Sequence, residues 1–387
     1  MSIAQPRVLQ VITQLGLGGA EAVAIDILSG LRPTEVAGLF CVRSKIRDDV
    51  GTTWNDHLRT TGVAVYGGSA VPIKFGGLLQ AAYRLARTLR SVRPDIVHLH
   101  TEIPELAYVL STVIDPSNSA LSVVRTIHNS TLWPRWRHVA AWTERRLTTA
   151  GVAAVSNSAL AGLDELRRAT GLRPIEARLS RVILNGRSVP VRARSRPCDD
   201  LIRVLFAGRF EPQKGADLLP SVLRHLGPDI NSSVVLTVAG SGTLGELLRY
   251  ELKRVPGLAA FAVTDPIPQL SEKLTDYDMV IVPSRFEGIG LLAIEAELAG
   301  VTVIVTRAPG LVEAVPPDHP WIAAPGDPAA FAATMAKALE QRERWSSVNA
   351  AAKAYAESRF ELAAMQRAYR NLYLNVATGR LSPSDDP

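Results

Sequence analysis

The sequence predicts an α/β protein made of two similar halves, each a doubly wound parallel sheet with helices on both faces. Short β-branched runs alternate with longer amphipathic runs along most of the chain, which is the pattern of βαβ units. This alternation lapses once, in a polar and basic stretch at 185–196 that we interpret as a linker, and then restarts. A length of 387 residues fits two domains.

The elements follow in order along the chain. In the first half we expect strands at 7–13, 37–42, 62–66, 94–100, 121–128 and 151–156, with helices at 19–31 and 78–92. In the second half we expect strands at 201–208, 232–240, 277–284 and 300–306, helices from about 215, 244 and 291, and two or three helical pieces across 328–376. In such sheets ligands bind beyond the carboxyl ends of the strands, so a cleft between the two halves is the expected site.

The composition is that of an ordinary globular protein, with 47% hydrophobic and 21% charged residues. No apolar run approaches the roughly 18 residues of a membrane span, and the first residues lack the pattern of a signal peptide. The two cysteines, Cys41 and Cys198, are far apart and outside any metal-type spacing, so we expect a protein of the reducing cytoplasm without a metal site.

The net charge of +6 is concentrated in the first half. Residues 1–190 hold 22 Lys and Arg against 14 Asp and Glu, whereas the remainder holds 21 against 23. This asymmetry suggests an anionic partner for the first half, such as a membrane surface, a polyanion or a phosphorylated substrate. A solvated surface of uneven charge explains it equally well. No nucleic-acid-binding module is present, so nucleic acid is not an expected partner.

Three loops at strand ends hold the candidate site residues. The first, "TQLGLGGAEAVAIDIL", is not a dinucleotide fingerprint, because Glu21 stands where the third small residue after Gly16 and Gly18 should be. It remains either a turn that approaches a phosphate or sugar with its amides or a structural turn. The second, "VLFAGRFEPQKGADLL", sets Arg209 and Lys214 around a turn, as either a diphosphate clamp or two surface cations.

The third loop is "VPSRFEGIGLLAIEAELAG". Glu287 falls beyond the end of a buried strand, and Gly288 and Gly290 let backbone amides face a ligand closely. Glu295 lies about one helical turn, roughly 5.4 Å, inside the helix that follows. Two carboxylates so placed can bind the hydroxyl groups of one extended ligand, since each accepts two hydrogen bonds. An acidic bias at a helix N-terminus is the alternative.

These segments together resemble the retaining glycosyltransferases of family 4, which have the GT-B fold of two Rossmann-like domains facing a central cleft. The resemblance rests on the Glu287-x7-Glu295 spacing and, in the family's order, on "GLGGAE", "TIHN", "AVSNS", "VILNG" and "AGRFEPQKG". It implies an acceptor-side domain at 1–187, a nucleotide-sugar domain at 188–361 and a C-terminal helix, 362–387, that returns to the first domain. Three positions depart from the family pattern: Thr243, Ile289 and the segment "APG" at 308–310.

The resemblance also implies roles for individual residues. Arg209 and Lys214 would bind the donor diphosphate, Glu295 the ribose, and Glu287 the hydroxyl groups of the donor sugar. His128, in "TIHN", would reach that sugar. Gly19 would lie near the phosphates, and the base would lie around residues 264–270. The donor-binding backbone of the third loop comprises Gly288, Ile289, Gly290 and Leu291.

The function implied is transfer of a hexose from a nucleoside-diphosphate sugar to a glycan or lipid-linked acceptor, with retention and with no metal or other cofactor. UDP and GDP stay open as the nucleotide. The cations at the diphosphate would take the place of a metal, and His128 would orient and polarise the sugar. A sugar-nucleotide epimerase or phosphorylase on the same fold, and a degenerate transferase serving as a binding partner, are the alternatives. A glycoside hydrolase using Glu287 and Glu295 leaves Arg209 and Lys214 without a role.

The stretch 132–146 suggests a further hypothesis. Its three tryptophans, Trp133, Trp136 and Trp142, stand among arginines (Arg135, Arg137, Arg145 and Arg146), a combination that suits an anionic membrane interface. Peripheral attachment at the inner face of the plasma membrane would bring the protein to a lipid-linked acceptor. The alternative is tryptophans packed on the first domain, with the arginines solvated.

Overall fold

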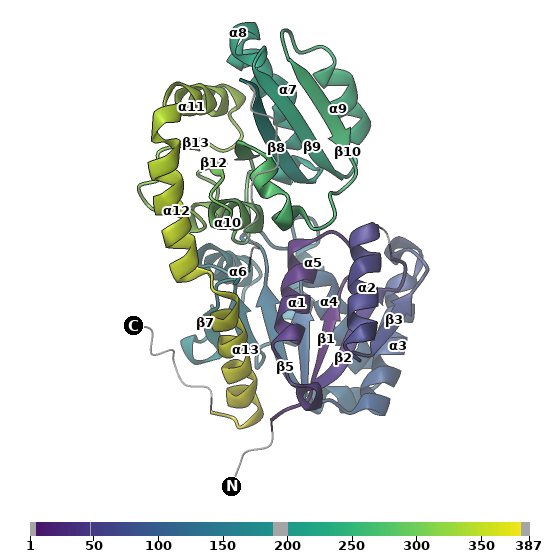
Figure 1. Ribbon diagram of the computed structural model, residues 1–387. Helices are drawn as coiled ribbons and strands as arrows, with labels where there is room; N and C mark the ends of the chain where they lie inside the picture. The colour runs from purple at the N-terminus through teal and green to yellow at the C-terminus, as the bar shows by residue number, and fades with distance from the viewer. Residues whose placement is uncertain (1–4, 47, 189–199, 381–387) are drawn as a thin grey trace. The chain divides into compact units, whose positions relative to one another are not determined.

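The computed structural model describes residues 5–46, 48–188 and 200–380, so most of the expected linker lies outside the described residues. The chain forms two compact units: residues 1–185 together with 362–387, and residues 186–361. Both sheets are parallel throughout, with helices between successive strands (Figure 1). The prediction of two doubly wound parallel sheets is confirmed.

The first unit is built on a seven-stranded sheet of order β3-β2-β1-β4-β5-β6-β7. Its strands are β1 (Val8–Ile12), β2 (Val36–Arg43), β3 (Val65–Ser69), β4 (Ile96–His100), β5 (Ser122–Ile127), β6 (Gly151–Ala154) and β7 (Ser180–Val182). Its helices are α1 (Gly19–Ser29), α2 (Asp49–Thr60), α3 (Gly77–Val92), α4 (Glu102–Ile114), α5 (Arg137–Glu144), α6 (Asn157–Ala169) and α13 (Leu362–Ala377).

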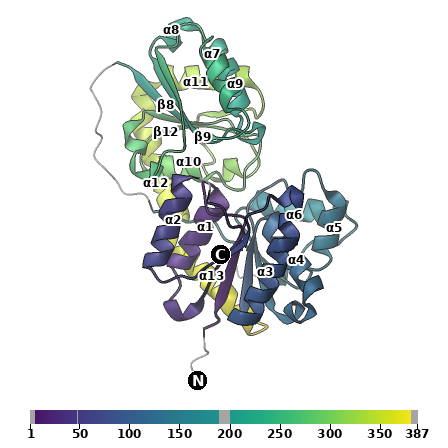
Figure 2. The same cartoon turned by 90° about the vertical axis from the view of Figure 1, so that its right-hand side faces the viewer.

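Alternate side chains of these strands enter two different cores, because successive residues of a strand point to opposite faces of the sheet. On one face, Leu9 and Val11 pack with the buried side of α3 and α4. On the other face, Ile12 packs with α1 and α2 (Figure 2). The strand order reverses between β1 and β4, and ligands of such sheets bind at this kind of switch point.

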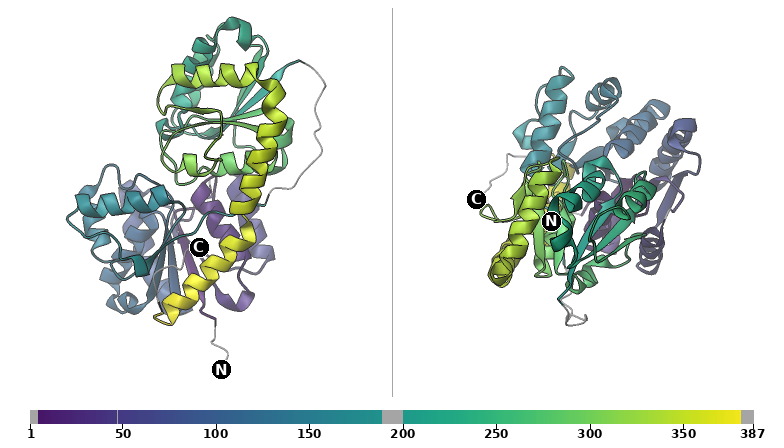
Figure 3. Two further views of the ribbon diagram at one scale, coloured as in Figure 1. Left: turned by 90° about the vertical axis from the view of Figure 1, so that its left-hand side faces the viewer. Right: turned by 90° about the horizontal axis from the view of Figure 1, so that it is seen from above.

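Helix α13, the last element of the chain, belongs to the first unit (Figure 3). Tyr369 and Tyr373 are fully buried there. Gln366 Nε2 donates a hydrogen bond to the carbonyl of Asp26, 2.8 Å away, and Arg370 pairs with the carboxylate of Glu35 at 3.2 Å. Residues more than 330 positions apart in the sequence therefore complete one core.

The second unit has a six-stranded sheet of order β10-β9-β8-β11-β12-β13. Its strands are β8 (Ile202–Arg209), β9 (Val234–Ser241), β10 (Ala260–Thr264), β11 (Met279–Val282), β12 (Thr302–Thr306) and β13 (Ile322–Ala323). Its helices are α7 (Leu219–Leu226), α8 (Pro228–Asn231), α9 (Gly245–Leu252), α10 (Leu291–Leu298), α11 (Pro328–Glu340) and α12 (Trp345–Arg359). One apolar core lies between its sheet and α7, α9 and α11.

Some details differ from the sequence predictions. The helix expected from about residue 215 begins at Leu219, after two short 3-10 turns, and the strand expected at 62–66 lies at Val65–Ser69. Cys41 is a buried free thiol whose pKa is raised to about 12 by burial, while Cys198 is outside the described residues. Within the described residues, we find no helix that is long and apolar enough to span a membrane.

Candidate active site

Two loops of the second unit, 209–215 and 283–287, lie against each other. The amide of Arg285 donates to the carbonyl of Gln213 at 2.8 Å, and Gln213 Nε2 donates to the carbonyl of Phe286 at 3.3 Å. Gly215 makes this approach possible. Its φ is 70°, and a Cβ at this position would lie 2.1 Å from the carbonyl oxygen of Pro283, so no other residue fits without moving the loops.

The contact brings together two of the predicted site residues. Lys214 Nζ lies 2.7 and 2.8 Å from the two carboxylate oxygens of Glu287. Ser284 Oγ donates a third hydrogen bond to Glu287, at 2.7 Å. The carboxylate is buried and the ammonium is about one-quarter exposed, so the lysine can contact a ligand while it keeps its partner.

Arg209 lies at the exposed end of β8, where its Nη2 donates to Gln213 Oε1 at 2.8 Å. Gln213 therefore links the predicted clamp arginine to the loop that holds Glu287. The sequence analysis did not identify Gln213 or Ser284. Their only signal was their position within the two loops.

The segment between Glu287 and α10 presents backbone rather than side chains. Gly290 has φ 75° and precedes the first helical residue, Leu291. The side chain of Ile289 is buried, so this position offers a ligand its amide only. Gly310, the last residue of "APG", is also required, because a Cβ there would lie 2.4 Å from the carbonyl oxygens of Glu287 and Gly288.

Glu295 has a partner that the sequence analysis missed. Its Oε1 lies 2.9 Å from Nε of Arg187, and both side chains are about 15% exposed. The backbone of Arg187 is held by a hydrogen bond from its amide to the carbonyl of Phe360, at 2.8 Å. Glu287 and Glu295, the two carboxylates of the predicted motif, therefore each face a cation of the second unit.

In the first unit, the predicted glycine-rich loop leads into α1, with Gly19 as its first residue. Asp48, which the sequence analysis did not identify, holds this loop. Its carboxylate accepts hydrogen bonds from the amides of Leu17 at 3.0 Å and Gly51 at 2.8 Å. Asp48 therefore ties the loop after β1 to the start of α2.

His128 lies at the carboxyl end of β5 and belongs to a ladder of three histidines. Its Nε2 is 2.9 Å from Nδ1 of His100, whose Nε2 is 3.0 Å from Oε1 of Gln10. The ring of His98 lies 4.0 Å from that of His100, and its Nδ1 is 2.7 Å from the hydroxyl of Tyr373 on α13. Burial lowers the pKa of His128 to about 3, so this histidine is neutral at physiological pH.

The tryptophan–arginine stretch fits the alternative of packed tryptophans better than the hypothesis of a membrane face. Trp133 is buried. Trp142 is partly buried beneath the guanidinium of Arg146, which lies 4.1 Å from the ring centroid. Only Trp136 is largely exposed, at 52%. A membrane face built from three tryptophans is therefore wrong for this segment, because packing against α4 and α6 takes up the first of them.

Within the described residues, no group of three or more His, Cys, Asp or Glu side chains could hold a metal ion. The region expected around the base, residues 264–270, follows the edge strand β10. Its position at the carboxyl end of a strand is compatible with ligand contact.

Two family models match the chain. "Glycosyltransferase Family 4" matches residues 17–188, and "Glycosyl transferases group 1" matches residues 191–356. A D-inositol 3-phosphate glycosyltransferase of Streptomyces scabiei is 32% identical over 180 residues, which cover 43% of this chain and 40% of that relative. A glycogen synthase of Mycobacterium tuberculosis is 27% identical over 326 residues, covering 79% and 75%.

Solved structures with the same fold include Anabaena HepE in complex with UDP-glucose, with a TM-score of 0.76 and 18% identity over 96% of this chain and 100% of that one. A sucrose-phosphate synthase from Thermosynechococcus elongatus has a TM-score of 0.74 and 15% identity, with the same coverage of both chains. The two matched models together span most of the sequence, and both sheets are those of the GT-B fold. Each half of the chain therefore matches a glycosyltransferase family model, and the two matches support a GT-B glycosyltransferase of the family 4 and group 1 type.

Proposed function

We propose that the protein is a retaining glycosyltransferase that moves a hexose from a nucleoside-diphosphate sugar to a glycan or lipid-linked acceptor without a metal ion. The observation that carries the proposal is the contact between Lys214 and Glu287, at 2.7 and 2.8 Å, with Arg209 on the same loop. This arrangement sets cations for a diphosphate directly beside a carboxylate for sugar hydroxyl groups. The similar structure of HepE holds UDP-glucose, which makes UDP the first nucleotide to test.

In the proposed reaction, the bond between the anomeric carbon and the diphosphate oxygen breaks, and the electron pair leaves on the diphosphate. Arg209, Lys214 and the amides of residues 288–291 stabilise that charge. The acceptor oxygen bonds to the anomeric carbon on the face that the diphosphate leaves, and its proton passes to a donor phosphate oxygen. His128 is neutral, so it orients and polarises the sugar rather than donating a proton.

The pairing of each carboxylate argues against a glycoside hydrolase. Such an enzyme needs one carboxylic acid to protonate the leaving group, whereas Glu287 faces Lys214 and Glu295 faces Arg187. An epimerase or a phosphorylase on the same fold would use the same clamp. Product analysis with the donor alone and with inorganic phosphate separates these two from a transferase.

The first test is thermal shift with UDP, GDP and ADP in the presence of EDTA. A nucleotide at 100 times its Kd should stabilise the folded chain by about 2.7 kcal/mol. We expect one nucleotide to raise Tm, and we expect Glu295→Ala to abolish that rise because the ribose contact is lost.

Arg187→Ala is the matched control, since it breaks the same 2.9 Å ion pair and leaves the carboxylate in place. It should keep the nucleotide-induced shift. An unchanged shift in Glu295→Ala would remove the ribose role of that residue. If none of the three nucleotides shifts Tm, the alternative of a degenerate transferase that serves as a binding partner would be favoured.

We also propose that the protein attaches peripherally to an anionic membrane through residues 71–90, which include most of α3, rather than through the tryptophan stretch. Val71, Phe75, Leu79 and Tyr83 recur every four residues and are 42–69% exposed. Lys74, Arg84, Arg87 and Arg90 are exposed in the same segment. The sequence has no acidic residue between Asp56 and Asp95. An apolar stripe flanked by cations suits an anionic lipid surface.

Co-sedimentation with vesicles tests this attachment. The chain should sediment with phosphatidylglycerol vesicles and much less with phosphatidylcholine alone, and added salt should release it. The double change Phe75→Ser with Leu79→Ser should abolish sedimentation. Leu247→Ser with Tyr250→Ser, which alters two apolar residues of the second unit that are 51% and 54% exposed, should not. An equal loss of sedimentation in both double variants, or no sedimentation of the unaltered chain, would refute the membrane role of residues 71–90.

A further inference from the structure

A small recess opens beside His128 in the first unit, and His128 is the one residue of its lining to which the reaction proposed above assigns a role. Its volume is about 30 Å³, enough for a water-sized group. We call it the His128 recess and define it by six of its lining residues: Thr101, Glu102, Glu105, Arg125, His128 and Trp133. His128, Thr101 and Glu102 are partly exposed at its mouth, whereas Glu105, Arg125 and Trp133 are buried.

Two hydrogen-bond donors on the buried side of this recess have no partner among the described residues. They are Nη1 of Arg125 and Nε1 of Trp133, whose side chains are 1% and 5% exposed. Buried donors nearly always find a partner, because a donor that is removed from water and left unpaired destabilises the fold. A ligand group or a water molecule in the recess would satisfy both.

The backbone around the recess is strained at two positions. Thr101 has φ 71° and ψ 171°, a region that is almost reserved for glycine, and Trp133 has φ 47°. The amide of Trp133 lies 3.4 Å from Oε1 of Glu102, which ties the two segments together. Strained residues of this kind gather at ligand sites, and here both line the same recess.

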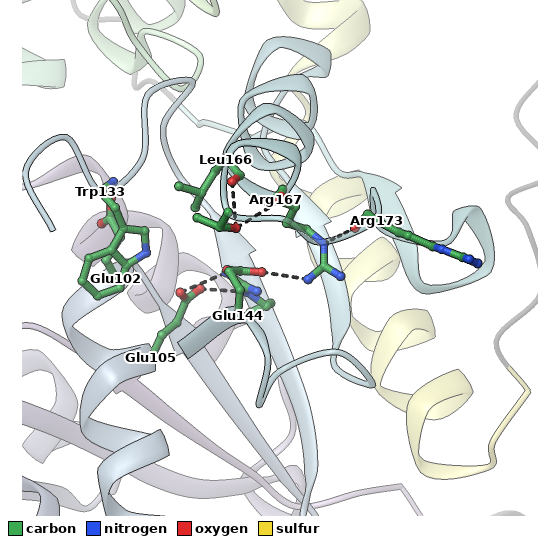
Figure 4. A network of polar contacts seen from close by, with 9 residues as sticks. Glu102, Glu105, Trp133, Glu144, Leu166, Arg167 and Arg173 are labelled. Atoms are coloured by element: carbon green, nitrogen blue, oxygen red, sulfur yellow. Dashed lines mark hydrogen bonds and ion pairs between the residues drawn. The ribbon is translucent and has the colours of Figure 1, made fainter. Parts of the chain in front are cut away.

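The charges around the recess decide which ligand it suits. Arg125 Nε and Nη2 bind the carboxylate of Glu105 at 2.8 and 2.9 Å, and Nη2 also binds Glu144 at 2.6 Å. Arg167 Nη1 forms an ion pair with the other carboxylate oxygen of Glu144, at 3.0 Å (Figure 4). The recess and its surroundings thus hold two arginines and, with Glu102, three glutamates. Their summed charge is not positive, whether Glu105 is ionised or protonated. An anion such as phosphate would therefore meet no unbalanced cation.

We propose that the His128 recess binds a neutral hydroxyl group of the acceptor, and that it selects an uncharged polyol or sugar over a phosphorylated one. Trp133 Nε1–H and Arg125 Nη1–H donate hydrogen bonds to the hydroxyl oxygen, and the carboxylate of Glu102 accepts its proton in a hydrogen bond. This inference rests on the proposed transferase function, since it names the acceptor class. It adds Trp133 and Glu102 as residues that determine acceptor specificity.

The test follows the indole N–H resonances of the six tryptophans by NMR of the full chain, with and without UDP. D-glucose and glucose 6-phosphate are the probes, because they share a ring and differ by one phosphate. Trp133→Phe removes the N–H, keeps an aromatic ring and identifies the resonance. We expect D-glucose to shift this resonance saturably and glucose 6-phosphate to shift it less.

Glu102→Gln should weaken the D-glucose response by about 3- to 10-fold, because a neutral amide oxygen replaces a charged acceptor and makes a weaker hydrogen bond. Trp142→Phe, at a partly buried tryptophan outside the recess, should leave it unchanged. A silent Trp133 resonance, or a stronger response to glucose 6-phosphate, would overturn the proposal. If UDP raises Tm while Trp133 stays silent, only the recess assignment fails. If UDP also has no effect, the proposed function fails with it.

Discussion

Lys214→Met is expected to lower kcat by about 100- to 1000-fold, the loss seen when one donor to a developing oxyanion is removed. The reason is the charge that leaves on the diphosphate, which Lys214 would stabilise in the transition state. The same change leaves Glu287 buried without its cation, since Ser284 Oγ is its remaining side-chain donor. The free energy of unfolding should therefore fall as well, by about 1–3 kcal/mol.

The double variant Lys214→Met with Glu287→Gln separates the two effects. An uncharged amide needs no cation beside it, so Tm should return toward that of the unaltered chain while kcat stays low. Arg285→Met is the control, because its ion pair with Asp217, 2.7 Å long, joins the second loop to the 3-10 turn that follows the first loop, outside the clamp. Steady-state kinetics and thermal unfolding measure both quantities. Recovery of kcat in the double variant would show that Lys214 only supports the fold.

Arg125→Met should destabilise the first unit by about 3–5 kcal/mol, the cost of removing one partner from a buried ion pair. Arg125 holds Glu105 and Glu144 at the same time, and all three side chains are at most 2% exposed. Burial raises the pKa of Glu105 to about 8 even against the charge of Arg125. Removing the arginine should raise this pKa further, because the charge of Arg125 lowers it. Glu105 should then stay protonated at neutral pH, and adding Glu105→Gln should recover part of the loss.

Urea unfolding followed by far-UV circular dichroism measures this change. Arg178→Met is the control, since it breaks an ion pair with Glu176 whose side chains are 52% and 64% exposed. Exposed ion pairs contribute little to stability, so the free energy of unfolding should change by less than about 0.5 kcal/mol in this control. If Arg125→Met lowered the free energy of unfolding as little as the control does, water would have to reach the network and solvate the carboxylates.

The sequence predicted the fold well because buried parallel strands and their covering helices differ in hydrophobic period. The shortest strands could not be predicted from this period. β7 and β13 have three and two residues and lie at sheet edges, so they carry too few side chains to show a period. The 3-10 turn at Ala216–Leu218 was included in the helix expected from about residue 215, because three residues are too few to distinguish a 3-10 turn from an α-helix.

The two loops predicted to hold Arg209, Lys214 and Glu287 lie together in the structure, but the partner of Glu295 was not predicted. The pairing of Arg187 with Glu295 joins residues more than 100 positions apart, and local spacing holds no information about such contacts. Arg125 did carry a signal, since a charged residue inside the expected strand at 121–128 must find a buried counter-charge. The burial of Trp133 stayed open in the sequence, because a tryptophan among arginines looks the same whether its ring is solvated or buried.

The place of α13 in the first unit has a consequence for how the chain is made. A ribosome releases residues 186–361 before residues 362–377, and domains generally fold as units during synthesis. The second unit can therefore finish folding while the first still lacks the tyrosines that bond to His98 and Thr126. Until α13 has been synthesised, His98 lacks its partner Tyr373 and is accessible to water. The environment of His128, which would polarise the sugar, is therefore complete only after the last helix has folded onto the first unit.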